Sequence, residues 1–283
     1  MHSENNLMSA AAVQMPRIIY GTAWKKQATA ELVELALRTG FRGIDTACQP
    51  KHYNERGVGD GIAAAKQRGL LTRDQLYLQT KFTPLNGQDP QNIPYDQQAD
   101  LAEQVRQSFD VSLNNLQTAY LDGLVLHSPL ADRQQLMQVW QAMEKLVQAG
   151  HVRQLGISNC YDPALFEFLY DAATIKPALI QNRFYADTGY DVALRAFCKQ
   201  HAVIYQSFWT LTANPAVLAD TVLKNLAVQY RRTPAQLLFR YLTQQDMIPL
   251  TGTRSISHMQ EDLAIFEFHL TESECQQIRC LLE

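Results

Sequence analysis

The sequence lacks the features of several protein classes. It has no block of Lys and Arg, and its 25 basic and 28 acidic residues give a formal net charge of −3. Proteins that bind nucleic acid or charged membranes usually carry a basic stripe, so neither partner is expected. No apolar run approaches the ~20 residues of a membrane-spanning helix, and residues 1–14 do not have the pattern of a signal peptide.

Cysteines are few, scattered and odd in number. None of the five forms a Cys-x-x-Cys pair, and Cys275 and Cys280 are the closest two. Because disulfides persist mainly in oxidising compartments, we expect reduced thiols and a cytoplasmic protein. No group of His, Cys and Asp has the spacing of metal ligands, so no metal site is predicted. Cys160 has no obvious base as a partner, which argues against a cysteine nucleophile.

The sequence also lacks a linker rich in Pro, Gly or Ser. With 46% hydrophobic and 19% charged residues, its composition is that of an ordinary globular protein. We therefore predict a single domain over residues 1–283, in which residues 1–14 form a flexible N-terminal extension.

Short apolar runs alternate with amphipathic stretches from end to end. The strand-like runs cover residues 17–20, 43–44, 75–79, 123–126, 152–157, 178–180, 202–205 and 247–250. Helical periodicity follows each run, for example over residues 29–38, 54–68 and 233–242. This alternation is typical of a parallel sheet with helical crossovers. Eight units in 283 residues favour an α/β fold of the (β/α)8 TIM barrel type over the alternative, an open doubly wound sheet.

Polar residues follow every strand-like run. They are Gly21-Thr22, Asp45-Thr46, Thr80-Lys81, His127-Ser128, Ser158-Asn159, Gln181-Asn182, Gln206-Ser207 and Thr251-Gly252-Thr253-Arg254. In a barrel, the carboxyl ends of the strands meet at one rim and hold the functional groups. A polar ligand is therefore predicted at this rim, with the long segment Pro84 to Asp96 lying over it.

Residues near this rim have the chemistry of proton transfer. Asp45 and Lys81 can form an ion pair, and a Lys ammonium beside a Tyr hydroxyl lowers the pKa of that phenol. A Tyr tuned in this way would act as a general acid. His127 would donate a hydrogen bond to a carbonyl oxygen and orient it.

Seven motifs, in order and spacing, resemble those of the aldo-keto reductase superfamily from Met15 to Asp262. They are Gly21-Thr22-Ala23-Trp24-Lys25, the segment Gly40 to Ala47, Tyr53-Asn54-Glu55 with Val58-Gly59, Leu78-Gln79-Thr80-Lys81, Tyr120-Leu121-Asp122 leading to Leu126-His127-Ser128-Pro129, Gly150-His151-Val152-Arg153 leading to Gly156-Ile157-Ser158-Asn159, and Gln181.

The resemblance implies an NAD(P)H-dependent enzyme that reduces aldehydes or ketones to alcohols. Hydride would come from nicotinamide C4 and the proton from Tyr53, with Asp45, Lys81 and His127 as the other catalytic residues. Trp24 would line the substrate site with Tyr53 and His127, unless it only caps the barrel mouth. The residues expected to bind the cofactor are Thr22, Lys25, Asp45, Ser158, Asn159, Gln181, Gln206, Ser207, Thr253, Arg254 and Asp262.

The sequence departs from the family pattern near the proposed acid. The family commonly has its Tyr five residues after the Asp, whereas Pro50 occupies that position here. The segment from Cys48 to His52 therefore looks like an insertion, and His52 is an alternative acid to Tyr53. Family members usually have an aromatic residue that stacks on the nicotinamide, and it has no clear counterpart here. Tyr205, Phe208 or Trp209 could take that place, or Gln206 could replace the aromatic residue.

Cofactor choice and assembly are further expectations. Arg254, with Thr253 and Ser255, offers a guanidinium and hydroxyls to a 2′-phosphate, which favours NADPH over NADH. We expect a monomer that acts on a small carbonyl compound. Two alternative functions are a weakly catalytic NADPH-binding regulatory protein on the same fold, and a barrel enzyme with hydrolytic or isomerase chemistry.

Overall fold

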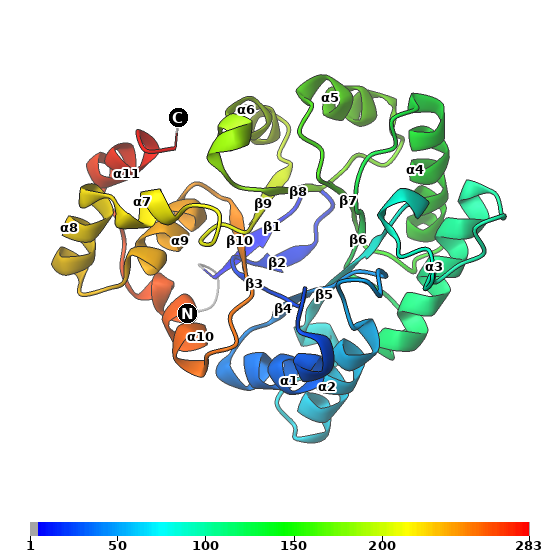
Figure 1. Cartoon of the computed structure of the whole chain (residues 1–283), viewed down its shortest axis with the longest axis horizontal. Coiled ribbons are helices and arrows are strands. Elements are labelled where there is room, and N and C mark those ends of the chain that lie inside the picture. The colour runs from blue at the N-terminus through cyan, green and yellow to red at the C-terminus, as the bar shows by residue number, and fades with distance from the viewer. Residues whose placement is uncertain (1–4, 283) are drawn as a thin grey trace.

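The computed structural model describes residues 5–282, and at its centre is a closed barrel of eight parallel strands (Figure 1). Closure comes from the pairing of β10 with β3, which confirms the predicted (β/α)8 barrel and excludes the open sheet. In chain order the strands are β3 (Ile19–Gly21), β4 (Gly43–Asp45), β5 (Tyr77–Phe82), β6 (Gly123–Leu126), β7 (Leu155–Ser158), β8 (Leu179–Arg183), β9 (Ile204–Phe208) and β10 (Ile248–Thr251).

Helices surround the barrel, as Figure 1 shows. They are α1 (Thr29–Thr39), α2 (Glu55–Gln67), α3 (Leu101–Leu116), α4 (Arg133–Gln148), α5 (Pro163–Ala172), α6 (Val192–Gln200), α7 (Pro215–Ala219), α8 (Thr221–Tyr230), α9 (Pro234–Gln244), α10 (Ile256–Leu263) and α11 (Glu272–Arg279). Side-chain caps fix where several of them begin. Asp162 accepts from the backbone N–H of Ala164 with Pro163 in the first turn of α5, and Thr233 and Gln236 form a capping box on α9.

Strand β5 lies further along the chain than predicted, because the expected run 75–79 begins in a 3-10 turn over Arg73–Gln75. The strand continues through polar residues up to Phe82. Leu78 and Phe82 pack in the apolar layer between barrel and helices. The alternate residues Tyr77, Gln79 and Lys81 face the barrel interior, where apolar side chains give way to polar ones toward the carboxyl end.

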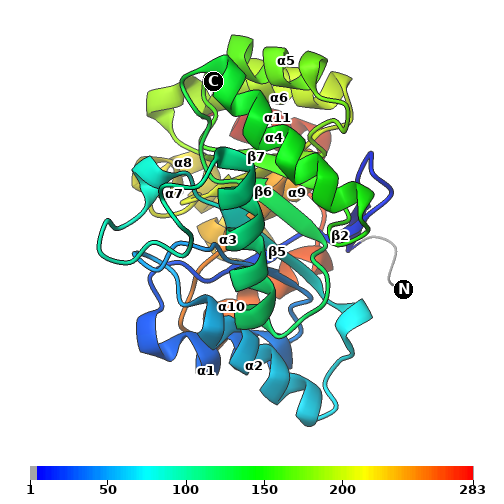
Figure 2. The same ribbon diagram turned by 90° about the vertical axis from the view of Figure 1, so that its right-hand side faces the viewer.

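The N-terminal segment is an ordered hairpin, which corrects the flexible extension expected over residues 1–14; residues 1–4 of that range lie outside the described part. Strands β1 (Asn6–Met8) and β2 (Gln14–Pro16) pair antiparallel. Met15 is fully buried in a cluster with residues that open the barrel strands, such as Ile19 and Tyr77. The hairpin thus closes the amino end of the barrel, opposite the loop between β5 and α3 (Figure 2).

Glycines in α2 allow its close packing against both neighbouring helices. A Cβ atom on Gly59 would lie 2.1 Å from the carbonyl oxygen of Asn115 in α3, and one on Gly61 would lie 2.6 Å from that of Ala30 in α1. The run Gly57-Val58-Gly59-Asp60-Gly61 therefore serves helix packing.

Candidate active site

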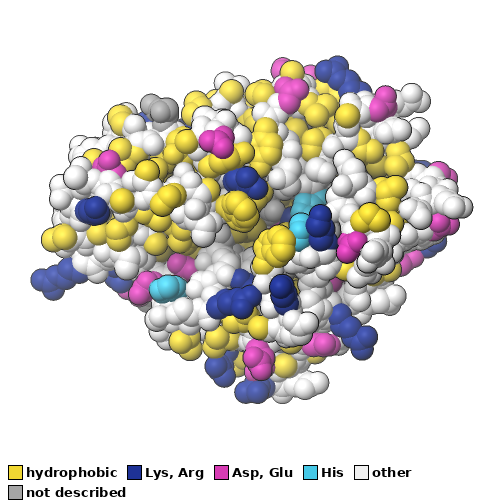
Figure 3. All heavy atoms as spheres, in the orientation of Figure 1, with side chains coloured by type: hydrophobic (Ala, Val, Ile, Leu, Met, Phe, Trp, Pro, Cys, Tyr) yellow, Lys and Arg dark blue, Asp and Glu magenta, His cyan; other side chains and the backbone are white. Residues whose placement is uncertain are grey.

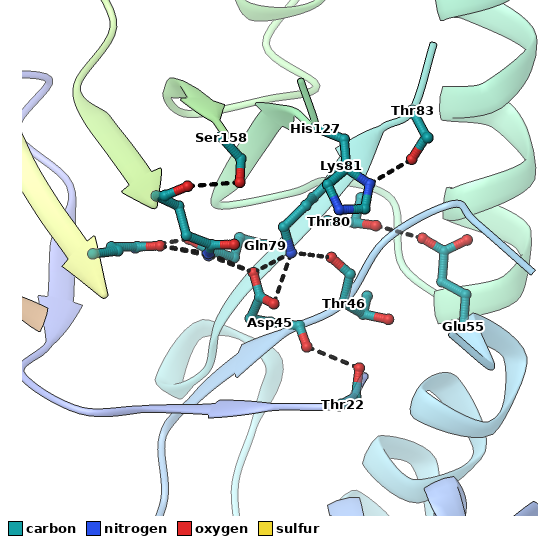
Figure 4. A network of polar contacts seen from close by, with 12 residues as sticks. Thr22, Asp45, Thr46, Glu55, Gln79, Thr80, Lys81, Thr83, His127 and Ser158 are labelled. Atoms are coloured by element: carbon teal, nitrogen blue, oxygen red, sulfur yellow. Dashed lines mark hydrogen bonds and ion pairs between the residues drawn. The ribbon is translucent and has the colours of Figure 1, made fainter. Parts of the chain in front are cut away.

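A buried ion pair lies at the carboxyl end of the barrel (Figure 4). Lys81 Nζ is 2.6 Å and 2.7 Å from the two carboxylate oxygens of Asp45, and it donates a third hydrogen bond to the carbonyl oxygen of Thr46 at 2.8 Å. Both side chains are at most 3% exposed. Burial lowers the pKa of Lys81, and the Asp45 carboxylate opposes that effect. The predicted pair is therefore present, and all three ammonium N–H groups are occupied.

Three glutamine side chains complete a polar layer across the barrel. Gln79 and Gln181 donate to Asp45 Oδ1 at 2.7 Å and 3.0 Å, and both donate to Gln206 Oε1 at 2.8 Å. Gln206 is fully buried and returns a hydrogen bond to Gln79. Sequence reasoning did not select Gln79 as a site residue, although its position two residues before Lys81 on one strand puts both on the same face.

Tyr53 reaches the site in spite of the insertion before it. The inserted segment folds back as a turn in which Gln49 O accepts hydrogen bonds from the backbone N–H groups of His52 and Tyr53. The Tyr53 ring centroid then lies 5.9 Å from that of His127 and 5.3 Å from Lys81 Nζ. The structure therefore brings together the four residues that sequence reasoning assigned to proton transfer, Tyr53 included.

The pKa of Tyr53 is shifted in the direction opposite to the one expected. Burial, together with the Asp45 carboxylate, raises the pKa of the Tyr53 hydroxyl above its ordinary value. Lys81 does not lower it, because its ammonium N–H groups are used by Asp45 and Thr46 and its charge is balanced by the carboxylate. Tyr53 is consequently protonated at neutral pH, the state that a proton donor needs.

His127 follows β6 and is held by a residue that follows β5. Its Nδ1 atom is 2.7 Å from the hydroxyl oxygen of Thr83. Burial and the charge of Lys81 hold the pKa of His127 well below its usual range, so the imidazole is neutral. If the Thr83 hydroxyl donates to Nδ1, the remaining proton is on Nε2. Sequence reasoning did not select Thr83, which is the second residue after Lys81.

Trp24 and His52 form one wall of the mouth. Their ring centroids are 4.0 Å apart, and the Trp24 backbone N–H donates to His52 O at 2.7 Å. Trp24 has φ +62° and is 51% exposed, so its indole is available to a bound molecule. The inserted segment therefore supports the residue that was predicted to line the substrate site.

The loop between β5 and α3 is tied to the inserted segment. Gln88 Nε2 donates to Cys48 O at 3.0 Å, and Gln49 Nε2 donates to Gly87 O at 2.6 Å. Tyr95 donates its hydroxyl hydrogen to Thr83 O at 2.8 Å. These bonds hold the loop against the same side of the mouth as Tyr53 and His127.

The residues expected beside the nicotinamide lie at the ends of three strands. Ser158 Oγ donates to Gln181 O at 2.6 Å, and Asn159 Nδ2 donates to His127 O at 2.8 Å. Asn159 has φ +53°, a conformation that Asn adopts more readily than most residues. Thr22 donates its hydroxyl hydrogen to Asp45 O at 2.8 Å.

Strand β9 and the residue after it contain the four candidates for the position that stacks on the nicotinamide. Gln206 faces inward and belongs to the polar layer, whereas Tyr205 faces outward and donates to Asp191 Oδ2 at 2.8 Å. Ser207 is fully buried and accepts a hydrogen bond from Thr210. Trp209 is the residue after the strand whose ring is exposed, at 50%.

The residues expected near the cofactor phosphates lie between β3 and α10. Lys25 Nζ donates to Gly252 O, and Arg254 Nη2 donates to Trp24 O at 2.8 Å. Thr253 Oγ1 accepts from the backbone N–H of Ser255, the cap of α10. Asp262 is buried, accepts from Thr251 Oγ1 at 2.7 Å, and has a pKa raised by burial to about 6.

The face that contains the mouth is hollowed and carries basic, histidine and hydrophobic side chains around the hollow (Figure 3). Within residues 5–282, no group of three or more His, Cys, Asp and Glu side chains is placed to hold a metal ion. No helix in the same range is long and apolar enough to cross a membrane.

Comparisons with known proteins agree with this geometry. The model of the aldo/keto reductase family matches residues 17–283. A 9,11-endoperoxide prostaglandin H2 reductase of Trypanosoma cruzi is 29% identical, over 94% of this chain and 88% of the relative. An NAD(P)H-dependent D-xylose reductase of Candida tropicalis is 27% identical, with the same coverage.

Solved structures share the fold. An aldo/keto reductase from Brucella melitensis superimposes with a TM-score of 0.82 and 26% identity, covering 98% of both chains. An aldo-keto reductase from a deep-sea metagenome library, 22% identical with a TM-score of 0.83 over 97% of this chain and 94% of its own, has the same fold. The match over nearly the whole chain, on a barrel of this kind, makes this protein a member of the aldo/keto reductase family of oxidoreductases.

Proposed function

We propose that this protein reduces an aldehyde or a ketone to the alcohol with NAD(P)H, and that Tyr53 donates the proton. The observation that carries the proposal is the position of the Tyr53 ring beside His127 and Lys81 at the barrel mouth. Because the turn from Cys48 to His52 absorbs the inserted residues, this observation favours catalysis over a purely regulatory role.

Each of these residues has a defined task in the proposed reaction. When bound, a nicotinamide cofactor supplies hydride from its C4 atom to the carbonyl carbon. Neutral His127 donates a hydrogen bond from Nε2 to the carbonyl oxygen and orients it. Tyr53 transfers its hydroxyl proton to that oxygen, so the O–H bond of the alcohol forms as that of the phenol breaks. Lys81, paired with Asp45, balances the carboxylate charge that lies beside Tyr53.

The residues that would hold the cofactor have suitable chemistry. Among residues 5–282, Lys25 and Arg254 bond to backbone carbonyl oxygens and not to carboxylates, so their charges are available to phosphates. The Thr253 and Ser255 hydroxyls lie beside Arg254 at the start of α10. This donor set supports NADPH over NADH. Asn159 and Gln181 supply amide groups for the carboxamide of the nicotinamide.

We further propose that the enzyme works as a monomer in the cytoplasm. The small carbonyl substrate would enter beside Trp24, whose indole lines the mouth next to His52. Light scattering after size-exclusion chromatography tests the monomer, since a dimer would double the 32.1 kDa mass of the chain.

The experiment combines a titration with an assay. NADPH and NADH are titrated separately against protein fluorescence, and reduction of 4-nitrobenzaldehyde is followed at the absorbance of the reduced nucleotide. Tyr53→Phe should lower kcat by about 100-fold or more, because it removes the proton donor, while NADPH affinity stays unchanged.

His52→Asn is the matched control, since His52 is the alternative acid in the same segment. It should keep most of the activity. If Tyr53→Phe is as active as the wild type while His52→Asn is inactive, His52 is the acid. Binding of NADPH without turnover would support the regulatory alternative, and failure of both nucleotides to bind would contradict the proposed function.

A further inference from the structure

Arg183 is a cation at the barrel mouth that the activity described so far does not use. It is the last residue of β8 and follows Gln181 by two positions. Because successive strand residues alternate between faces, its Cβ is on the inward side, above the polar layer that contains Gln181. Strand β8 is separated by β7 alone from β6, the strand that leads to His127. The backbones of β8 and β6 are therefore two strand spacings apart, about 10 Å.

Aromatic rings hold the Arg183 guanidinium in place. Its Cζ atom lies 4.2 Å from the centroid of the Trp209 ring and 5.1 Å from that of the Tyr185 ring. The three side chains border a cavity of about 550 Å³ together with Asp187 and Thr212. Stacking of this kind fixes the plane of a guanidinium and leaves its edge free for hydrogen bonds.

Arg183 has no acidic partner within residues 5–282. None of the ion pairs in that range includes it, although Asp187 borders the same cavity. Its Nε atom is buried and has no hydrogen-bond partner among the described residues. Since an unpaired buried N–H group of a charged side chain is costly, this arrangement points to an acceptor supplied by a bound molecule.

A second link connects Arg183 to the catalytic residues. Its backbone N–H donates to the Tyr161 hydroxyl at 3.1 Å, and that hydroxyl donates to Asn159 Oδ1 at 3.3 Å. Asn159 in turn donates to the carbonyl oxygen of His127. The rim at Arg183 is therefore continuous with the proposed site of carbonyl reduction.

We propose that Arg183 is an oxyanion-binding residue of this mouth and takes a carboxylate or phosphate group of the molecule that binds there. A planar guanidinium with a free edge binds either group through paired hydrogen bonds. The carboxylate would belong to the carbonyl substrate and the phosphate to the dinucleotide, so this proposal deepens the proposed function and rests on it for the choice of ligand.

The test compares Arg183→Gln and Arg183→Lys with the wild type. Arg153→Gln is the matched control: Arg153 also stacks on a ring, that of Tyr120, and lies before β7, at the amino end of the barrel. One arm measures dissociation constants for NADPH and inorganic pyrophosphate by calorimetry. The other measures KM for 4-carboxybenzaldehyde and for its neutral methyl ester.

Arg183→Gln should weaken the binding of one of these anions by about tenfold or more, because a charge-assisted pair of hydrogen bonds is lost. Arg183→Lys should weaken that binding less, and Arg153→Gln should leave it unchanged. Weaker binding of NADPH and pyrophosphate identifies the phosphate, and a higher KM confined to the carboxylate substrate identifies the carboxylate. Unchanged values in both arms overturn the proposal. A wild type that reduces neither aldehyde overturns the proposed function instead, and pyrophosphate binding still decides the role of Arg183.

Discussion

The hydroxyl oxygen of Thr83 lies 2.7 Å from Nδ1 of His127. The carbonyl oxygen of Thr83 accepts hydrogen bonds from Tyr95 and Gln88, so its backbone is fixed by the loop that follows β5. A hydroxyl held in this way fixes the orientation of the imidazole, and its donation to Nδ1 would place the remaining proton on Nε2. Thr83 is thus a positioning residue for the proposed hydrogen bond from His127 to a carbonyl oxygen.

Thr83→Val is expected to lower kcat/KM about tenfold, because one hydrogen bond of ordinary strength is lost. Thr83→Ser keeps the hydroxyl and should retain most of the activity. Imidazole ¹⁵N shifts provide a readout beyond the rate: Thr83→Val should populate both tautomers of His127, whereas the wild type and Thr83→Ser should have one. A single unchanged tautomer in Thr83→Val would show that Thr83 does not set it.

The pH dependence of reduction is expected to be weak near neutrality. The pKa of Tyr53 is raised, so its proton stays in place as the pH rises through 8, and the pKa of His127 is lowered, so it stays neutral as the pH falls to 6.5. Values of kcat/KM measured at constant ionic strength should therefore form a plateau between these limits. A steep fall centred near pH 7 would mean that one of these groups titrates there. Oxidation of the alcohol, which needs the Tyr53 phenolate, should become faster as the pH rises.

Asp262→Asn is expected to stabilise the fold at pH 8. The folded pKa of Asp262 is raised from 3.8 to about 6, so the folded state binds the proton more tightly than the unfolded chain does. The free energy of unfolding therefore falls by about 2 to 3 kcal/mol as the pH rises from about 4 to about 6, and it stays at the lower value above pH 6. Asn removes this cost and still accepts the hydrogen bond from Thr251.

Thermal unfolding at pH 4 and pH 8 provides the measurement for Asp262→Asn. The gain in Tm should be large at pH 8 and small at pH 4. Glu261→Gln removes a charge from the same helix but leaves the Asp262 carboxyl in place, so it should raise Tm at pH 8 by much less than Asp262→Asn does. An equal gain at both pH values would argue against ionisation as the cause.

Gly59→Ala is expected to destabilise the protein by about 3 kcal/mol, since the added methyl group would overlap the Asn115 carbonyl oxygen. In an unhindered helix the same change stabilises by about 1 kcal/mol, so the sign of the effect is diagnostic. Urea unfolding gives the value, with Lys66→Ala on the exposed face of α2 as the control. A Gly59→Ala protein as stable as the wild type would show that α2 and α3 can separate at no cost.

The repeating units of the barrel were predictable because each apolar run is followed by a helix with its own start and stop signals. Strand β6 has the predicted bounds, Gly123–Leu126, since all four of its residues are small or apolar. Strand β5 was misplaced because Gln79, Thr80 and Lys81 do not resemble a strand by composition. Gln79 and Lys81 face the polar layer inside the barrel and Thr80 bonds to Glu55 of α2, contacts that periodicity alone does not reveal.

The proximity of the four residues proposed for proton transfer was predictable from strand ends and motifs, whereas their electrostatics were not. The pKa of Tyr53 depends on its burial and on the Asp45 carboxylate, and both follow from packing between segments that are distant in the sequence. The N-terminal hairpin was missed because each of its strands has only three residues. The burial of the hairpin depends on strand residues that are distant in the sequence, such as Ile248 of β10.

The hairpin also bears on the order of folding. Arg17, which follows it, donates to the carbonyl oxygen of Thr243 at 2.9 Å and pairs with Asp246 at 2.8 Å, across more than 220 residues of chain. These contacts, like the pairing of β3 with β10, require the last strand of the barrel. Since such distant contacts form slowly and a growing chain acquires them last, the cluster around Met15 stays incomplete until Ile248 of the last strand has been made. The hairpin, which precedes every barrel strand in the chain, is therefore among the last segments to reach its final place.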